Sequence, residues 1–298
     1  MVYSPKTLFI ATRPWSFPVS IAPVLLTTLF VWQQTAATWQ TAAVAVWVVI
    51  STMLFHAASN LWSDYFDYRK GVDTDPSVGS PTITGGLMTA HDTLVYATIL
   101  IIIAVLNGLA LMLVTQCLPL LVFGALGVLL SVCYPWLKFH ALGDLDIFLT
   151  FGVLPTLGTA YVLLGSLSWF SLWITPAFIT ITVAVLHSNN TRDTERDGKA
   201  RIHTLAMLIG PRISRWKYYF EVWLPLGWVV LCVILGVMPW YVILASALAS
   251  VFALRNTRTM AVSAHGGSID TLDVQTAQHQ LFNVICLSIA LIIHILCS

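Results

Sequence analysis

The residues best suited to chemistry in this chain are two groups of carboxylates, each placed directly after a long apolar segment. The first group consists of Asn60, Asp64, Asp67, Asp73 and Asp75. The second group consists of Asn190, Asp193, Glu195 and Asp197. Together they hold seven of the thirteen Asp and Glu residues of the chain. Carboxylates are costly at a membrane boundary and rarely lack a function there, so this concentration indicates a divalent-metal site.

The spacing within both groups is that of one helix face. The amide and the first two carboxylates stand at positions i, i+4 and i+7 in the first group and at i, i+3 and i+7 in the second. If each helix continues through its motif, two such faces opposite each other bring four carboxylates together, and their repulsion raises their pKa values. Mg²⁺ relieves that repulsion, and it prefers a few carboxylates, waters and phosphate oxygens to an all-protein cage. A substrate diphosphate that bridges the metal ions would complete such a site.

Basic residues lie around both groups and suit a departing pyrophosphate, whose charge grows as its bond to carbon breaks. The candidate substrate and diphosphate ligands are Asn60, Ser63, Arg69, Lys70, Asp73, Lys138, Asn190, Arg192, Lys199 and Arg201, and Arg196 lies beside them. The alternative is that such cations are ordinary solvated loop charges on the cytoplasmic side. We favour that alternative for Arg212, Arg215, Lys217, Arg255 and Arg258.

The composition is that of a polytopic membrane protein. The chain has 298 residues, of which 58% are hydrophobic and 9% charged, whereas a soluble domain carries about 25% charge. Its net charge of +1 gives no indication of a nucleic-acid partner, and we expect none. The lipid bilayer is the expected surroundings of most of the chain.

Apolar windows of about 20 residues predict an all-α protein with nine transmembrane helices around a central cavity. The predicted spans are 15–33, 41–60, 93–115, 118–135, 145–165, 168–188, 217–236, 239–254 and 278–297. All fourteen Lys and Arg residues fall before the first span or in every second loop after it. The positive-inside rule therefore places the N-terminus and both carboxylate groups in the cytoplasm and the C-terminus outside, in an inner (cytoplasmic) membrane.

The whole chain, 1–298, is expected to form one transmembrane domain. The two carboxylate groups recur about 130 residues apart, each after the second helix of a four-helix set. This recurrence predicts two similar halves, about 13–140 and 141–255, followed by a last helix at about 277–298. Both halves would deliver their acidic face to one cavity.

At these motifs the chain resembles the UbiA family of intramembrane prenyltransferases, and within it the branch that prenylates 1,4-dihydroxy-2-naphthoate on the way to menaquinone. The resemblance runs along most of the chain. The matching segments are RPWSFPVSIAPVLL (Arg13–Leu26), SDYFDYRKGVDT (Ser63–Thr74), GSPTITGGLMT (Gly79–Thr89), ALGDLDIFLTFGVLPTLGTAYV (Ala141–Val162), NNTRDTERD (Asn189–Asp197), HTLAMLIG (His203–Gly210) and TAQHQLF (Thr276–Phe282). The paired Asp motifs are specific in combination, and the other segments support them.

The resemblance implies a Mg²⁺-dependent reaction at the cytoplasmic end of a nine-helix fold. An allylic polyprenyl diphosphate ionises, an electron-rich ring attacks the carbocation and pyrophosphate leaves. In the naphthoate branch the ring carboxylate is lost as CO₂. By resemblance, the residues that hold Mg²⁺ and the diphosphate are Asp64, Asp67, Asp193 and Asp197, with Asn190 and Asp73 assisting.

The chain departs from the family pattern at three places. Ser63 stands where the family usually has Asn, Pro81 stands where the branch commonly has Arg, and Arg201-Ile202 stand where it commonly has Gly-Lys. Ser63 or Asn60 can supply the missing ligand. Lys199 and Arg201 can supply the missing positive charge.

Four further polar residues lie near the motifs. His56 and His187 could act as acid or base, although a hydrogen-bonded core histidine is the favoured interpretation. Asp144 and Asp146 begin the fifth predicted helix, where they complement its dipole. Because the family pattern has an acidic residue at Asp144, contact with the acceptor is the alternative there.

Two rival functions share some of these features. An alcohol phosphotransferase would also use Asp and Mg²⁺, but its more compact motif with a trailing GxxxDxxxD is not found. A secondary transporter binds at the bilayer midplane through broken helices with buried charges. No Lys, Arg, Asp or Glu lies in the middle of a predicted span, which disfavours ion-coupled transport.

Overall fold

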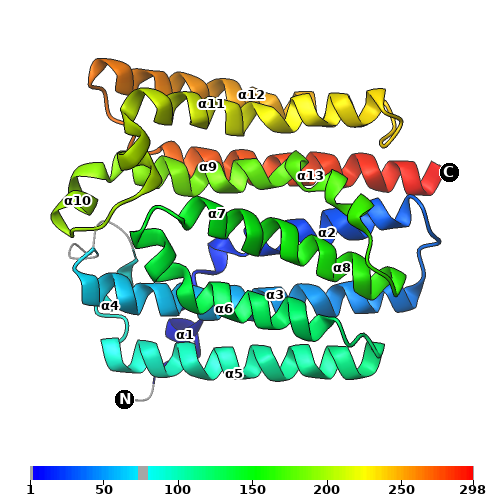
Figure 1. The fold of residues 1–298 in the computed structure, drawn as a ribbon, viewed down its shortest axis with the longest axis horizontal. Helices are drawn as coiled ribbons and strands as arrows, with labels where there is room; N and C mark the ends of the chain where they lie inside the picture. The colour runs from blue at the N-terminus through cyan, green and yellow to red at the C-terminus, as the bar shows by residue number, and fades with distance from the viewer. Residues whose placement is uncertain (1–2, 73–79, 298) are drawn as a thin grey trace.

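The computed structural model describes residues 3–72 and 80–297, and this part of the chain is helical without a β-strand. Its long helices lie side by side along one direction (Figure 1). They are α2 (Pro18–Trp32), α3 (Trp39–Lys70), α5 (Ala90–Thr115), α6 (Leu120–Phe139), α8 (Leu154–Leu164), α9 (Pro176–Arg192), α11 (Leu205–Ile234), α12 (Val242–Val262) and α13 (Leu272–Cys297). The short helices are α1 (Pro5–Ala11), α4 (Pro81–Thr84), α7 (Gly143–Phe148) and α10 (Thr194–Lys199), with 3₁₀ turns at Pro14–Ser16, Trp169–Ile174 and Ser263–His265.

The helices are arranged in layers. In Figure 1, α11 and α12 form one outer layer, α9 and α13 lie beneath it, and α5 lies at the opposite edge beyond α3 and α6. The extensive pairings are α3 with α5, α9 with α11, and α12 with α13. The short helices α4 and α10 lie at the same end of the bundle (Figure 1). This end carries the polar site described below.

Seven helical segments of the described chain are long and apolar enough to cross a membrane. They are Pro14–Trp32, Trp39–Lys70, Ala90–Thr115, Leu120–Phe139, Gly143–Leu164, Leu205–Ile234 and Leu272–Cys297. Helices α9 and α12 occupy the places of the other two predicted spans, but they do not meet the same standard of length and hydropathy. The all-helical membrane fold is therefore confirmed, whereas the count of nine spans is not.

The outer faces of several helices expose large apolar side chains, as a lipid-facing surface requires. Examples are Ile99, Ile102, Leu106 and Leu113 on α5, Leu244 and Leu248 on α12, and Ile285 and Ile289 on α13. Beneath them a buried core joins α2 to the second half of the chain through Leu26, Phe30, Phe178, Val229 and Leu287. Water-soluble proteins rarely expose contiguous apolar area on this scale.

Helix α3 continues well past the predicted end at 60 because its end signals stand further out. Thr38 and Thr41 form a capping box at its start. Gly71 ends it in the left-handed conformation with φ 75°, which glycine adopts without steric cost. The first carboxylate group up to Asp67 therefore lies on one continuous helix, as the spacing required.

The second carboxylate group does not lie on one helix. Helix α9 ends at Arg192, and Asp193 interrupts the helical path with φ −91° and ψ 8° before α10 begins at Thr194. The single continuous face expected for this motif is therefore wrong. The break turns the chain at the end of the bundle, so that α10 folds back beside the site.

Helix α11 begins at Leu205, twelve residues before the predicted start at 217. Gly210, with φ 75°, and the following Pro211 mark a kink in it. Lys217 and Glu221 consequently lie well inside a membrane-length helix, whereas the predicted span had them at its start. Lys217 pairs there with Glu221 and with Asp144, with 2.7 Å from Lys217 Nζ to Asp144 Oδ2.

The fifth predicted span is one segment built from α7, a π-helical turn at Leu149–Val153 and α8. Gly152 in this turn packs closely on α9, since a Cβ added there would lie 2.7 Å from the Ile179 side chain. The π turn inserts one residue into the helical repeat and changes which side chains face the bundle interior.

Candidate active site

The two carboxylate groups meet at a polar cavity of about 830 Å³ at one end of the bundle. Its charged and amide lining comprises Arg13, Asn60, Asp67, Lys138, Asp146, Asn189, Asn190, Arg192, Asp193, Arg196, Asp197, Asp270 and Asp273. These residues come from α3, α6, α7, α9, α10 and α13, from the break at Asp193, and from the segments before Pro14–Ser16 and before α13. Residues distant in the sequence thus build one site.

The N-terminal turn supplies a cation to the first group. Arg13 has a left-handed backbone with φ 55° and forms an ion pair with the buried Asp64. Ser80 Oγ donates to Asp64 Oδ2 at 2.6 Å. The amide of Asn60 fixes the turn, because Nδ2 donates to the Thr12 carbonyl at 3.0 Å and to Ser16 Oγ at 3.1 Å. Asn60 therefore holds the segment that carries Arg13.

Asp67 points into the cavity and receives its cation from α6. Lys138 Nζ donates to Asp67 Oδ2 at 2.9 Å, and Ser63 Oγ donates to the same oxygen at 3.2 Å. The other oxygen, Oδ1, is buried and has no hydrogen-bond partner in the described part of the chain. Buried polar atoms are almost always paired, so an unpaired carboxylate oxygen beside a cavity marks a ligand position.

The second group finds its cations in its own segment. Arg192 makes a bidentate contact with Asp193, at 2.9 Å from Nε and 2.8 Å from Nη2, and Arg196 Nη2 donates to the same carboxylate at 2.7 Å. Arg192 Nη1 also donates to Asp273 at 2.7 Å. Asp197 is buried nearby, and burial raises its pKa to about 6. Lys138 and Arg196 act against that rise.

The predicted site residues fall into four sets. Those that line the polar cavity are Asn60, Ser63, Asp67, Lys138, Asn190, Arg192, Asp193 and Asp197. Asp64 lies directly behind Arg13 and Ser80 of the wall. Arg69, Lys70, Lys199 and Arg201 are exposed and do not line it. Asp73 and Asp75 lie outside the described residues.

The exposed cations make contacts away from the cavity. Lys199 pairs with Glu195 at 2.8 Å in solvent, and Arg69 Nη1 donates to the Tyr65 hydroxyl at 3.2 Å. Arg13 and Arg196, by contrast, both line the cavity.

The cavity also contains residues that the sequence did not mark as site residues: Arg13, Asp146, Asn189, Arg196, Asp270 and Asp273. Arg13 stood in a matching family segment, which was the only signal for it. Asp273 lies 80 residues beyond Asp193 in the sequence and is joined to it only through Arg192. Nothing in its local pattern marks it.

His56 and His187 are buried residues with hydrogen bonds to neighbouring hydroxyl groups. His56 bonds to Ser20 Oγ at 3.2 Å through Nδ1 and to Ser16 Oγ at 3.3 Å through Nε2, although it also lines the cavity. His187 bonds to Ser214 Oγ at 2.8 Å. Asp144, the residue that the family pattern favoured for acceptor contact, faces Lys217 and lines neither large cavity.

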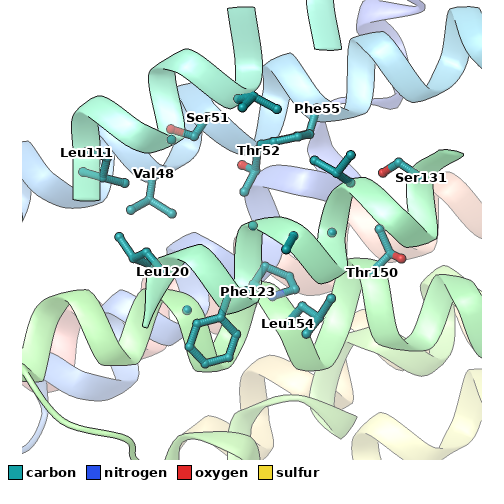
Figure 2. Close-up of a pocket in the computed structure, with 18 of the residues that line it drawn as sticks. Val48, Ser51, Thr52, Phe55, Leu111, Leu120, Phe123, Ser131, Thr150 and Leu154 are labelled. Carbon is teal, nitrogen blue, oxygen red and sulfur yellow. The ribbon is translucent and has the colours of Figure 1, made fainter. Parts of the chain in front are cut away.

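A second cavity, of about 680 Å³ and almost wholly apolar, adjoins the polar one. Figure 2 shows Ser131 and Thr150 at one end of it and Val48, Leu111 and Leu120 at the other. The residues that line both cavities are His56, Ser59, Ser131, Thr150 and Phe151. A ligand with a charged head and an apolar tail can therefore occupy both spaces at once.

The donor set suits Mg²⁺ that is completed by substrate. All the candidate ligands are oxygens, and Asp67 Oδ1 is buried and unpaired. The described residues hold no ready-made cluster of three acidic, Cys or His ligands. This agrees with the habit of Mg²⁺, which takes one or two carboxylates and fills its remaining positions with water and phosphate oxygens.

The fold and site define a class: a helical membrane protein with paired Asp motifs at one end and an adjoining apolar cavity. The family model of the UbiA prenyltransferase family matches residues 20–265, and the chain belongs to this family. The UbiA prenyltransferase domain-containing protein 1 of Ailuropoda melanoleuca is 34% identical over 221 residues, which are 72% of this chain and 65% of that protein. Its Homo sapiens counterpart is 33% identical, with 72% and 64% covered. The chain thus matches slightly less than two thirds of the length of these relatives.

Solved structures share the fold along nearly the whole chain. A UbiA homologue from Aeropyrum pernix K1 superposes with a TM-score of 0.67 at 14% identity, covering 98% of this chain and 99% of that one. A UbiA homologue from Archaeoglobus fulgidus, bound to GPP and Mg²⁺, has a TM-score of 0.62 at 15% identity, covering 95% and 99%. None of these relatives bears the name of the naphthoate branch, so that finer assignment is not shown.

Proposed function

We propose that the protein transfers a polyprenyl group from an allylic polyprenyl diphosphate to an aromatic acceptor, in a membrane and with Mg²⁺ as its cofactor. The junction of the two cavities carries this proposal. It places a space for an apolar tail beside a space lined by cations and carboxylates. The Archaeoglobus homologue of the same fold is described as bound to GPP and Mg²⁺, which supports the same pairing of ligands.

In the proposed reaction the C–O bond between the prenyl carbon and the diphosphate breaks, and pyrophosphate leaves with the electron pair. The cations of the wall, Arg13, Lys138, Arg192 and Arg196, stabilise the negative charge that grows on it. Mg²⁺ bound by Asp64, Asp67, Asn190, Asp193 and Asp197 would neutralise the same charge. An electron-rich ring carbon of the acceptor then attacks the allylic cation. The apolar wall excludes water, which would otherwise capture the cation.

The acceptor we propose is 1,4-dihydroxy-2-naphthoate, on the resemblance at the motifs described above. Its carboxylate leaves as CO₂, and those bonding electrons restore the aromatic ring. The active site would face the cytoplasm of a cell with menaquinone biosynthesis, with the N-terminus on the same side of the inner membrane. The alternative is the same chemistry on another aromatic acceptor. A transporter is the less favoured alternative, although Lys217 and Glu221 remove one sequence argument against it.

The test uses purified protein in detergent with Mg²⁺, radiolabelled geranyl diphosphate and 1,4-dihydroxy-2-naphthoate. Asp67→Ala and Asp193→Ala are measured beside the unaltered protein, with exposed Arg69→Ala as the matched control. We expect a prenylated, decarboxylated naphthoquinol from the unaltered protein and the control, none from the two Asp variants, and none with EDTA.

Three outcomes separate the alternatives. Turnover with a different aromatic ring but not with the naphthoate would keep the family chemistry and exclude the acceptor. Product formation that persists in EDTA would exclude the role of Mg²⁺. No pyrophosphate release with any aromatic acceptor would overturn the enzymatic proposal and favour transport or binding.

A further inference from the structure

Asp146 differs from the other buried acids at the polar cavity, Asp67 and Asp197, because no described basic side chain acts on its charge. It is 3% exposed and lines the cavity, yet the described residues give it no ion-pair partner. Its Oδ1 is buried without a hydrogen bond of normal length, and the Thr150 side chain is the described group that acts favourably on the carboxylate. By contrast, Asp67 and Asp193 are each held by a Lys or Arg.

An unpaired carboxylate in such a place is costly for folding. A buried carboxylate without a cation or hydrogen-bond donors destabilises the folded chain, and exceptions of this kind occur mainly at functional sites. Thr150 supplies one donor, so any further hydrogen-bond donor to Asp146 must arrive from the cavity. Lys138, Arg192 and Arg196 of the cavity wall already form ion pairs with other carboxylates.

The local backbone places Asp146 beside the reacting end of the tail cavity. One helical turn later, Thr150 lines both the polar and the apolar cavity, and its side chain acts on the Asp146 carboxylate although Oγ1 makes no hydrogen bond of normal length. Thr150 and Phe151 belong to the π-helical turn at Leu149–Val153. Turns of this type occur inside helices frequently at functional sites, because they redirect side chains. Figure 2 shows Thr150 beside Ser131 at the polar end of the apolar cavity.

We propose that Asp146 and Thr150 bind a hydroxyl group of the aromatic acceptor. Asp146 accepts the hydrogen bond of that hydroxyl, and the Thr150 hydroxyl provides a second contact to the same oxygen. The inference rests on the proposed prenyl transfer, because it places the acceptor ring at the junction of head and tail cavities. A hydroxyl that donates to a carboxylate gives the ring more electron density and so favours attack on a carbocation.

The site also implies which acceptor rings can bind and in which orientation. A negative charge at Asp146 repels an acceptor carboxylate, so an acid group on the ring must point toward the cations of the polar cavity. A ring whose hydroxyl is methylated cannot donate, and it leaves Asp146 unpaired. The acceptor class is therefore a free phenol or hydroquinone.

The test compares Asp146→Leu and Asp146→Asn with Asp144→Asn in the full-length protein. Asp144 is a matched control, since it is buried on the same helix but pairs with Lys217 outside the cavity. Initial rates are measured with geranyl diphosphate and 1,4-dihydroxy-2-naphthoate, each varied in turn. We expect Asp146→Leu to raise the KM of the naphthoate by about 10- to 100-fold, the loss of one hydrogen bond to a charged group, with the KM of geranyl diphosphate unchanged.

Asp146→Asn retains an acceptor oxygen, so its KM should lie between those of Asp146→Leu and the unaltered protein. Asp146→Leu should unfold at the same or a higher temperature, because it removes an unpaired buried charge. Asp144→Asn should unfold at a lower temperature with both KM values unchanged. The unaltered protein should discriminate against monomethyl ethers of the naphthoate far more strongly than Asp146→Leu does.

Unchanged acceptor KM in both Asp146 variants would overturn this inference while leaving prenyl transfer intact. An equal rise in the KM of geranyl diphosphate would also overturn it, because Asp146 would then serve the diphosphate. If the unaltered protein prenylates no hydroxylated ring, the proposed function itself fails. Loss of folding in Asp146→Leu leaves Asp146→Asn and the methyl ethers to decide.

Discussion

The first and second carboxylate groups reach the same cavity by opposite routes. The first lies on the uninterrupted helix α3 and takes its cations from elsewhere: Arg13 lies 51 residues before Asp64, and Lys138 lies 71 residues after Asp67. The second lies at the break between α9 and α10 and takes its cations, Arg192 and Arg196, from within the motif. One group is assembled by tertiary packing and the other mostly by local sequence.

This difference affects how each group tolerates change. A cation supplied across the bundle fixes the distance between two helices as well as a charge, so its loss also disturbs packing. A cation supplied from three residues away has a neighbour that can replace it. We therefore expect the first group to depend on single distant residues more than the second does.

The largest effect is expected where the two groups are alike, at the carboxylates themselves. Asp67→Asn and Asp193→Asn should each lower kcat/KM by about 100-fold or more, since each removes a negative ligand of the Mg²⁺–diphosphate at nearly constant size. Steady-state rates at saturating Mg²⁺ measure this. A loss below tenfold in one variant alone would show that the two groups are not equivalent ligands.

The second largest effect is expected from the loss of a cation, and it should differ between the first and second carboxylate groups. Lys138→Met leaves the buried Asp67 without its cation, and breaking a buried pair costs about 3–5 kcal/mol. Thermal unfolding in detergent should show a clear fall in Tm. Adding Asp67→Asn to Lys138→Met should restore much of the Tm, because the double variant leaves no bare charge. Failure of that restoration would show that Lys138 acts through other contacts.

Arg196→Ala should have a smaller effect in the second group. Asp193 keeps its bidentate contact with Arg192, and the Arg196 side chain is 30% exposed, so the loss of stability should be about 1 kcal/mol or less. The same unfolding assay measures it. A loss as large as that of Lys138→Met would remove the distinction between tertiary and local assembly.

The smallest effect concerns pH. Burial raises the pKa of Asp197 to about 6 in the chain without metal, so Asp197 is ionised at pH 7.5 and gains a proton as pH falls through 6. Below that value a proton competes with Mg²⁺, and the apparent affinity should fall by up to about tenfold per pH unit. Mg²⁺ titrations at pH 5.5 and 7.5 test this. Asp197→Asn should reduce that pH dependence, and an unaltered dependence would assign it to another group.

The sequence alone determined what local patterns can encode. Apolar windows predicted the helical membrane fold, because a chain in lipid must satisfy its backbone within helices. The spacing of Asn60, Asp64 and Asp67 predicted their shared face because the end signal of α3 lies beyond them at Gly71. The pairing of two Asp motifs indicated the family that the comparison confirms.

The tertiary structure decided which charges meet. Charged residues near the motifs in sequence, such as Arg69 and Lys199, point into solvent, whereas Arg13 and Asp273 arrive at the cavity from opposite ends of the chain. Asp144 and Asp146 stand two residues apart, yet one faces Lys217 and the other the cavity. No local pattern encodes these outcomes, because the rotation of each helix is set by packing against its neighbours across the bundle.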